Sequence, residues 1–142
     1  MIDTSTTSKR TPAQSRRRRA LYNASNWRTT VVLYACTTDP RTTSTKALEV
    51  LLRYAAAREW EVAEAILDPS PLTTPIFERE HWATVRDAIT ERRAEGIVAL
   101  RGHACEAGTA THAELSDWLA QRAAFLSVAE VTSRDRAERT PA

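Results

Sequence analysis

The sequence of 142 residues is poor in the features that mark secreted and membrane proteins. Its two cysteines, Cys36 and Cys105, lie far apart and in no metal-type spacing, which argues against a disulfide framework and favours a reduced setting. No stretch approaches the ~20 apolar residues that a membrane span needs, and no apolar signal-peptide core follows the basic start. We therefore expect a soluble, cytoplasmic protein without a membrane partner.

Excess positive charge is confined to the start of the chain. The formal net charge is only +2, yet the first 28 residues hold seven lysines and arginines against one acid, Asp3. This segment is rich in Thr, Ser, Arg and Asn and has too few apolar residues to offset the entropy of ordering itself. We predict a disordered basic arm at residues 1–27, one folded domain at residues 28–131 and a flexible tail at residues 132–142.

Four consecutive arginines, Arg16, Arg17, Arg18 and Arg19, lie within this arm. Arginines that neutralise phosphates release bound counterions, so the run is a candidate nucleic-acid-binding segment. A run of like charges is also typical of a solvated tail. DNA is the first candidate partner and another protein is the second, and the sequence leaves both open.

One stretch of the predicted domain runs from apolar residues directly into polar ones. Residues 31–35 are all apolar and follow two threonines, a pattern that suits a strand buried on both faces of a parallel sheet. We predict this strand at residues 30–36. The polar residues 37–40 would then form the loop at its carboxyl end, where open α/β sheets place their ligand sites.

Helix and strand patterns alternate along the rest of the chain. Residues 45–59 show helical apolar spacing, and a long second helix is predicted with Pro75 as its first residue and Gly96 as its stop. Thr111 and Glu114 form a capping box that opens a third helix. Short apolar runs predict further strands at residues 60–67, 96–100 and 125–130.

This alternation predicts an α/β fold of three layers, with helices on both faces of a four-stranded, mostly parallel sheet. The expected strand order is 2-1-3-4, so the chain reverses direction between the first and third strands. The loops at residues 36–44 and 101–111 then face each other across a crevice. Any functional site is expected in that crevice.

Two segments of this domain carry a resemblance to a known family. Tyr-Ala at residues 34–35, followed by Thr-Thr-Asp at residues 37–39, resembles the first strand and nucleophile loop of the N-terminal catalytic domain of serine recombinases (resolvases and invertases), where Tyr-Ala-Arg-x-Ser-Thr is usual. Residues 57–62 and the apolar strand that leads to Asp68 are similar to that family's second strand and acidic position. The resemblance covers residues 29–131. It implies a resolvase-like fold, in which a serine and a set of arginines act on DNA phosphates.

The departures from that family fall on the residues that carry its chemistry. Cys36 stands where the family has an arginine, and Thr37 or Thr38 stands where it has the attacking serine. The third-strand loop, usually Asp-Arg-x-x-Arg, reads Gly-His-Ala-Cys-Glu at residues 102–106, beside Arg101 alone. Losing positioned cations costs orders of magnitude in rate. The resemblance therefore implies a degenerate domain, and we do not expect an enzyme that cleaves and rejoins DNA.

The candidate catalytic residues are Thr37, Thr38, Asp68 and Arg101. Each of the first three also has an ordinary structural interpretation. The two threonines suit a polar turn and cap, and Asp68 precedes a proline and suits a strand end.

A metal site in the crevice is the remaining chemical candidate. Cys36, His103 and Cys105 would supply two thiolates and one imidazole, which leaves a fourth zinc ligand unassigned. Small buried cysteines are the commoner case. We predict no metal and no cofactor.

Two functions of different classes follow. The first is a recombinase-like domain without strand-transfer activity that acts as a DNA-associated or interaction module. The alternative is an unrelated α/β domain that binds a small ligand, or is an enzyme, in the crevice. Polar side chains that converge on the crevice would favour an active site, and splayed side chains would favour an interaction module.

Overall fold

A parallel sheet of four strands organises the part of the chain that the computed structural model describes, residues 28–106 and 108–132. The strands are β1 (Thr30–Cys36), β2 (Glu61–Asp68), β3 (Gly96–Leu100) and β4 (Phe125–Ala129). They lie in the order β2-β1-β3-β4, and every neighbouring pair is parallel. The predicted sheet and strand order are confirmed. The predictions for the arm at residues 1–27 and for the tail beyond residue 132 lie outside the described residues.

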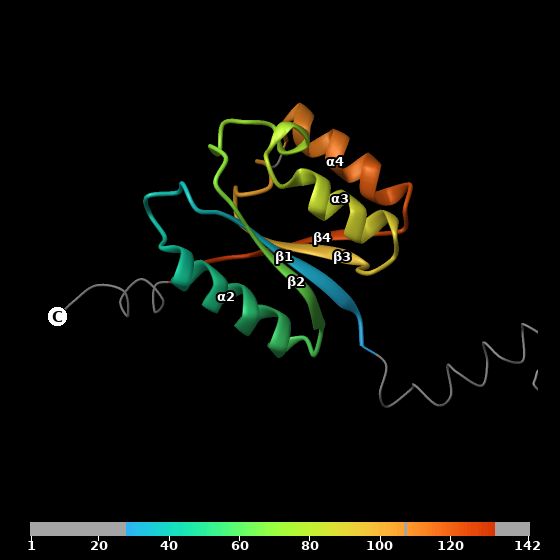
Figure 1. Ribbon diagram of the computed structural model, residues 1–142, viewed down its shortest axis with the longest axis horizontal. Coiled ribbons are helices and arrows are strands. Elements are labelled where there is room, and N and C mark those ends of the chain that lie inside the picture. The colour runs from blue at the N-terminus through green and yellow to red at the C-terminus, as the bar shows by residue number, and fades with distance from the viewer. Residues whose placement is uncertain (1–27, 107, 133–142) are drawn as a thin grey trace, which may run out of the picture.

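Helices cover both faces of this sheet, as Figure 1 shows. Helix α2 (Ser44–Ala57) lies on one face, and α3 (Trp82–Thr90) and α4 (Ala110–Ala120) lie on the other. Each face has its own apolar cluster, so the predicted three-layer α/β architecture is confirmed. Within residues 28–106 and 108–132, no helix has the length and apolar character to span a membrane.

Strand β1 lies at the centre and is buried on both faces, which explains its unbroken apolar run. Val31, Leu33 and Ala35 face α2. Tyr34 and Cys36 face α3 and α4, together with Val32. The alternation of side chains along a strand thus places a phenol and a thiol in the core, at the carboxyl end of β1.

The long second helix predicted from Pro75 is wrong at its start. Pro75 precedes a single 3-10 turn, η1 (Ile76–Glu78), and α3 begins only at Trp82. Between them Arg79 has an extended backbone, with φ −79° and ψ 156°. Its guanidinium is buried in the core.

The end of that predicted helix is also wrong. Helix α3 ends at Thr90, and the chain reverses at Arg92, whose φ of 63° is in the left-handed region. Gly96 is the first residue of β3 and not a helix stop. A Cβ atom at Gly96 would overlap the ring of Phe125, so the glycine is needed where an aromatic ring lies directly on the backbone.

Helix α4 begins earlier than the predicted capping box. Thr109 is the N-cap, because its backbone is extended and its hydroxyl accepts a hydrogen bond from His112 N at 3.1 Å. Thr111 lies inside the first turn of the helix. Either threonine satisfies the sequence rule for a cap, and the structure shows which one the chain uses.

Candidate functional site

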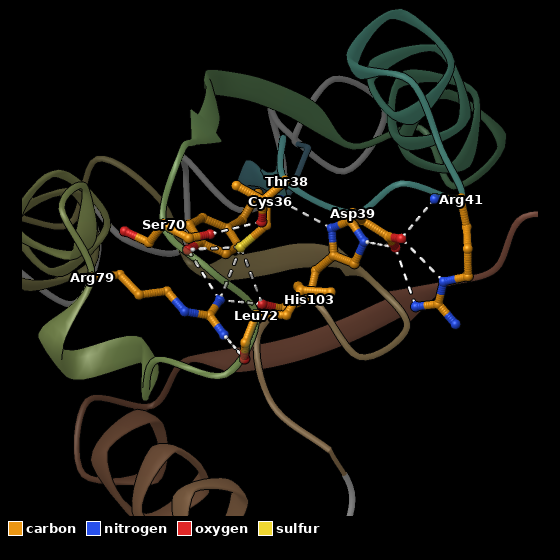
Figure 2. Close-up of polar contacts among 9 residues, drawn as sticks. Cys36, Thr38, Asp39, Arg41, Ser70, Leu72, Arg79 and His103 are labelled. Atoms are coloured by element: carbon orange, nitrogen blue, oxygen red, sulfur yellow. Dashed lines mark hydrogen bonds and ion pairs between the residues drawn. The ribbon is translucent and has the colours of Figure 1, made fainter.

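The carboxyl ends of the parallel strands meet at one edge of the sheet, which we call the carboxyl edge. There the loop after β1 and the loop after β3 are joined by one buried histidine, shown in Figure 2. His103 Nε2 lies 2.9 Å from Asp39 Oδ2, and Cys36 N–H donates to His103 Nδ1 at 3.0 Å. Because Nδ1 accepts, the neutral ring carries its hydrogen on Nε2 and donates it to the carboxylate.

Burial and charge fix the protonation states of this pair. His103 is 2% exposed, and burial lowers its pKa, although hydrogen bonding to Asp39 opposes that shift. Arg41 holds the pKa of Asp39 far below its usual range, since its Nε and Nη2 donate to the two carboxylate oxygens at 3.0 and 3.2 Å. A neutral imidazole therefore lies against an ionised carboxylate.

Arg79, a residue that the sequence did not single out, bonds to several segments at this edge. Its side chain is buried, and all three guanidinium nitrogens donate hydrogen bonds. Nε donates to Thr74 O at 2.7 Å and Nη2 to Leu72 O at 3.0 Å. Nη1 donates to Tyr34 Oη and to Cys36 Sγ, each at 3.2 Å, and to His103 O. One side chain thus connects the loop after β2 with β1 and with the loop after β3 (Figure 2).

Asp68 ends β2 and is fully buried. Its carboxylate accepts hydrogen bonds from Tyr34 Oη at 2.9 Å, from Ser70 N at 2.9 Å and from His81 N at 3.2 Å. Burial alone would raise the pKa of Asp68, but the donors, Ser70 foremost, outweigh burial and lower it. Burial raises the pKa of Tyr34, so the phenol stays protonated and acts as the donor.

These groups form one connected set, which we call the edge network: Tyr34, Cys36, Asp39, Asp68, Arg79 and His103. Of the predicted candidates, Asp68 belongs to it. Thr37 and Thr38 are exposed beside it, and their hydroxyls donate to the carbonyl oxygens of Asp68 at 3.5 Å and Ser70 at 3.0 Å. Arg101 forms an exposed ion pair with Glu130. The structure therefore does not bring the four candidates together.

Two of the three residues considered for a metal, His103 and Cys36, have their ligand atoms engaged by other groups. Both ring nitrogens of His103 are engaged in hydrogen bonds, and Cys36 Sγ lies beside the Arg79 cation. Burial raises the pKa of Cys36 and of Cys105, which disfavours the thiolate that binds a metal. Among the described residues, no group of three His, Cys, Asp or Glu side chains has an arrangement that could hold a metal ion. Arg16–Arg19 lie outside the described residues.

Two hollows lie along the predicted crevice, whose walls are connected by the hydrogen bond between Asp39 and His103. One hollow of about 320 Å³ lies between residues 72–75, residues 102–106 and the start of α4. The other, of about 430 Å³, lies between Asp39–Thr42 and the pair Arg101 and Glu130. Arg41 lines both hollows.

Arg79 escaped the sequence analysis because it lies among charged residues in a stretch that was interpreted as a helix. Its buried position depends on contacts with Tyr34, Cys36 and His103, which are distant in sequence, so no spacing of apolar residues signalled it.

Comparison with known proteins shows which solved structures share this architecture. No protein-family model matches the sequence, and no curated protein matches it. Among solved structures, the C-terminal catalytic domain of ISC1926 TnpA, an IS607-like serine recombinase, is similar with a TM-score of 0.59 and 12% identity, over 78% of this chain and 76% of that one. The N-terminal catalytic domain of TP901-1 integrase is similar with a TM-score of 0.59 and 16% identity, over 69% and 75%. The chain therefore has the fold of serine recombinase catalytic domains.

Proposed function

We propose that this chain is a recombinase-fold protein without strand-transfer chemistry, and that it acts as a DNA-associated or interaction module. The observation that carries the proposal is the saturation of the edge network. Arg79, the buried cation of that network, donates to the carbonyl oxygens of Leu72, Thr74 and His103. A cation engaged in this way stabilises loops and is not directed at a phosphate.

Strand transfer needs an activated hydroxyl as well as positioned cations. Thr37 and Thr38 are the hydroxyls at the relevant strand end, and both donate to backbone carbonyls. His103 is not free to take a proton from them, because Nδ1 accepts from Cys36 N–H and Nε2 faces Asp39. The Asp68 carboxylate already accepts three hydrogen bonds. The edge network thus supplies no free general base.

The distribution of charge supports association with DNA through the arm. Residues 28–132 contain eleven lysines and arginines against fifteen aspartates and glutamates, a net charge of −4, whereas residues 1–27 contain six against one. A polyanion such as DNA is repelled by the negative charge of residues 28–132 and attracted by the positive charge of residues 1–27. Arg16, Arg17, Arg18 and Arg19 supply most of that attraction.

Covalent chemistry is tested with supercoiled DNA and the full chain. After incubation, a denaturing gel is examined for a covalent protein–DNA adduct and for nicked or linear DNA, and we expect neither. An adduct formed by the unaltered protein but not by the Thr37→Ala, Thr38→Ala double variant would overturn the proposal. Substituting serine at either position is expected to leave the protein inactive, because the cations remain engaged.

DNA association is tested by a mobility-shift assay at low salt. Substituting Arg16, Arg17, Arg18 and Arg19 with Gln should abolish binding, since the released counterions drive it. The control makes the same change in charge at four exposed arginines of the folded body, Arg53, Arg58, Arg86 and Arg93, and should bind as the unaltered chain does. Equal loss in both variants would show that the arm has no special role. Binding that survives the arm substitution would exclude the arm as the site.

The alternative, an α/β domain that binds a small ligand in the crevice, rests on the hollow of about 320 Å³. Leu72, Ala104 and Cys105 line it together with the hydroxyls of Thr73 and Thr109, a mixture that is typical of ligand sites. A fragment screen by NMR tests it. Saturable shifts confined to Ala104, Cys105 and Thr109 amides would favour this function over the first.

A further inference from the structure

The two outer edges of the sheet are built differently. Edge strand β2 carries Glu61 and Glu64, and its pairing with β1 contains a register shift between Val31 and Val32. Charged residues and bulges of this kind discourage another strand from pairing. Edge strand β4, Phe-Leu-Ser-Val-Ala, contains no charge and no proline, and its register with β3 is unbroken. The protection that β2 has is absent from β4.

The hydrogen bonds of β4 show which of its backbone groups face outward. Phe125 N donates to Glu95 O, and Ala129 O accepts from Arg101 N, so alternate residues from 125 to 129 bond toward β3. The N–H and C=O groups of the two residues between them, Leu126 and Val128, therefore point away from the sheet. Among the described residues β4 is the last strand of the sheet. These groups are a template for one more strand.

We propose that β4 pairs antiparallel with β4 of a second copy of this chain, across a two-fold axis at Ser127. In this register the outward groups of Leu126 bond with those of Val128 of the partner subunit, and the reverse pair forms by symmetry. Phe125 lies opposite Ala129 of the partner subunit, so a large side chain meets a small one. The inference does not depend on the proposed function, because it uses no residue of the arm or of the edge network.

An exposed apolar side chain of β4 also fits a second copy of this chain. Val128 is 41% exposed although it is apolar, and pairing would bury it against Leu126 of the partner subunit.

The first test is the mass of the full chain in solution, by light scattering or sedimentation, over a rising concentration series. We expect the mass to double. Val128→Pro should keep the protein monomeric, because it removes an outward N–H and leaves the hydrogen bonds to β3 in place. Val128→Lys should weaken dimerisation at least tenfold. The matched control is Val62→Lys, at the 37% exposed valine of the β2 edge, which should dimerise normally.

A mass of one chain at every concentration would overturn the proposal. Equal weakening by Val62→Lys and Val128→Lys would also overturn it, because pairing would then involve both edges. Far-ultraviolet circular dichroism confirms that each variant is folded before its mass is compared.

The register is tested by cysteine substitution. Ser127 residues would form a non-hydrogen-bonded pair about 4.5 Å apart between Cα atoms, which is within disulfide reach. Ser127→Cys should therefore give a covalent dimer on mild oxidation, while the unaltered chain and Val62→Cys should not. A Ser127→Cys protein that dimerises but does not crosslink would rule out the two-fold axis at Ser127.

Discussion

The carboxyl edge contains two populations of polar side chains that differ in what they contact. In the edge network, Arg79, Asp68 and His103 are buried and bond to protein atoms on several sides. A few residues away, Thr38 and Arg101 are exposed and make few contacts. Buried groups in this fold stabilise the loops, whereas exposed groups remain available to other molecules. Polar residues at the expected position of an active site are therefore not in themselves an active site.

The largest difference between the two populations should follow from removing a buried cation. We expect Arg79→Ala to lower the free energy of unfolding by about 3–5 kcal/mol, since it leaves several buried acceptors without a donor. Chemical denaturation monitored by tryptophan fluorescence measures it. Arg101→Ala is the matched control, and it should leave the midpoint unchanged because Arg101 is exposed. Similar losses of unfolding free energy in both variants would show that buried and exposed polar side chains at this edge do not differ in their contribution to stability.

A smaller effect should appear as a dependence of stability on pH. Burial keeps His103 neutral in the folded chain, while Asp39 favours its protonation and the cations Arg41 and Arg79 oppose protonation. Its pKa is thus lower when folded than the usual 6.5. Stability is complete above pH 6.5 and falls below it, because only the unfolded chain then binds the proton. The slope is at most about 1.4 kcal/mol per pH unit.

The carboxylates act in a separate pH window. The pKa values of Asp39 and Asp68 are lowered from 3.8, so their stabilisation is lost only as the pH falls below that value. Unfolding curves between pH 4.5 and 7.5 therefore isolate the histidine. His103→Gln should flatten the dependence, and His112→Gln, on α4, should keep it. A flat profile for the unaltered chain would show that protonation of His103 is not coupled to folding.

The smallest effect is expected for the exposed hydroxyls. The Thr37→Ala, Thr38→Ala double variant should change the free energy of unfolding by less than about 0.5 kcal/mol, because both side chains are exposed. Mobility shifts with DNA should also be unchanged. A loss comparable with that of Arg79→Ala would place the two threonines with the buried population.

The sequence predicted the strands, their order and the position of the crevice because those depend on uninterrupted patterns. The apolar runs that form β1 and β3 can be recognised in the sequence without knowledge of any tertiary contact. The edge network could not be predicted from the sequence, because Arg79 belongs to it and lies in extended backbone between η1 and α3. The cap at Thr109 and the role of Gly96 also depend on neighbours distant in sequence, the latter on the Phe125 ring.

The contacts of Arg79 have a consequence for the order of events in folding. They reach 45 residues back to Tyr34, 43 back to Cys36 and 24 forward to His103, so they cannot form until β1 and the loop after β3 have come together. We therefore expect the network to close after the rate-limiting step of folding. In stopped-flow measurements, loss of Arg79 should speed unfolding and leave the refolding rate nearly unchanged. That result would mean that the polar edge of this domain sets how long the native state lasts, whereas the apolar strands set how quickly it is reached.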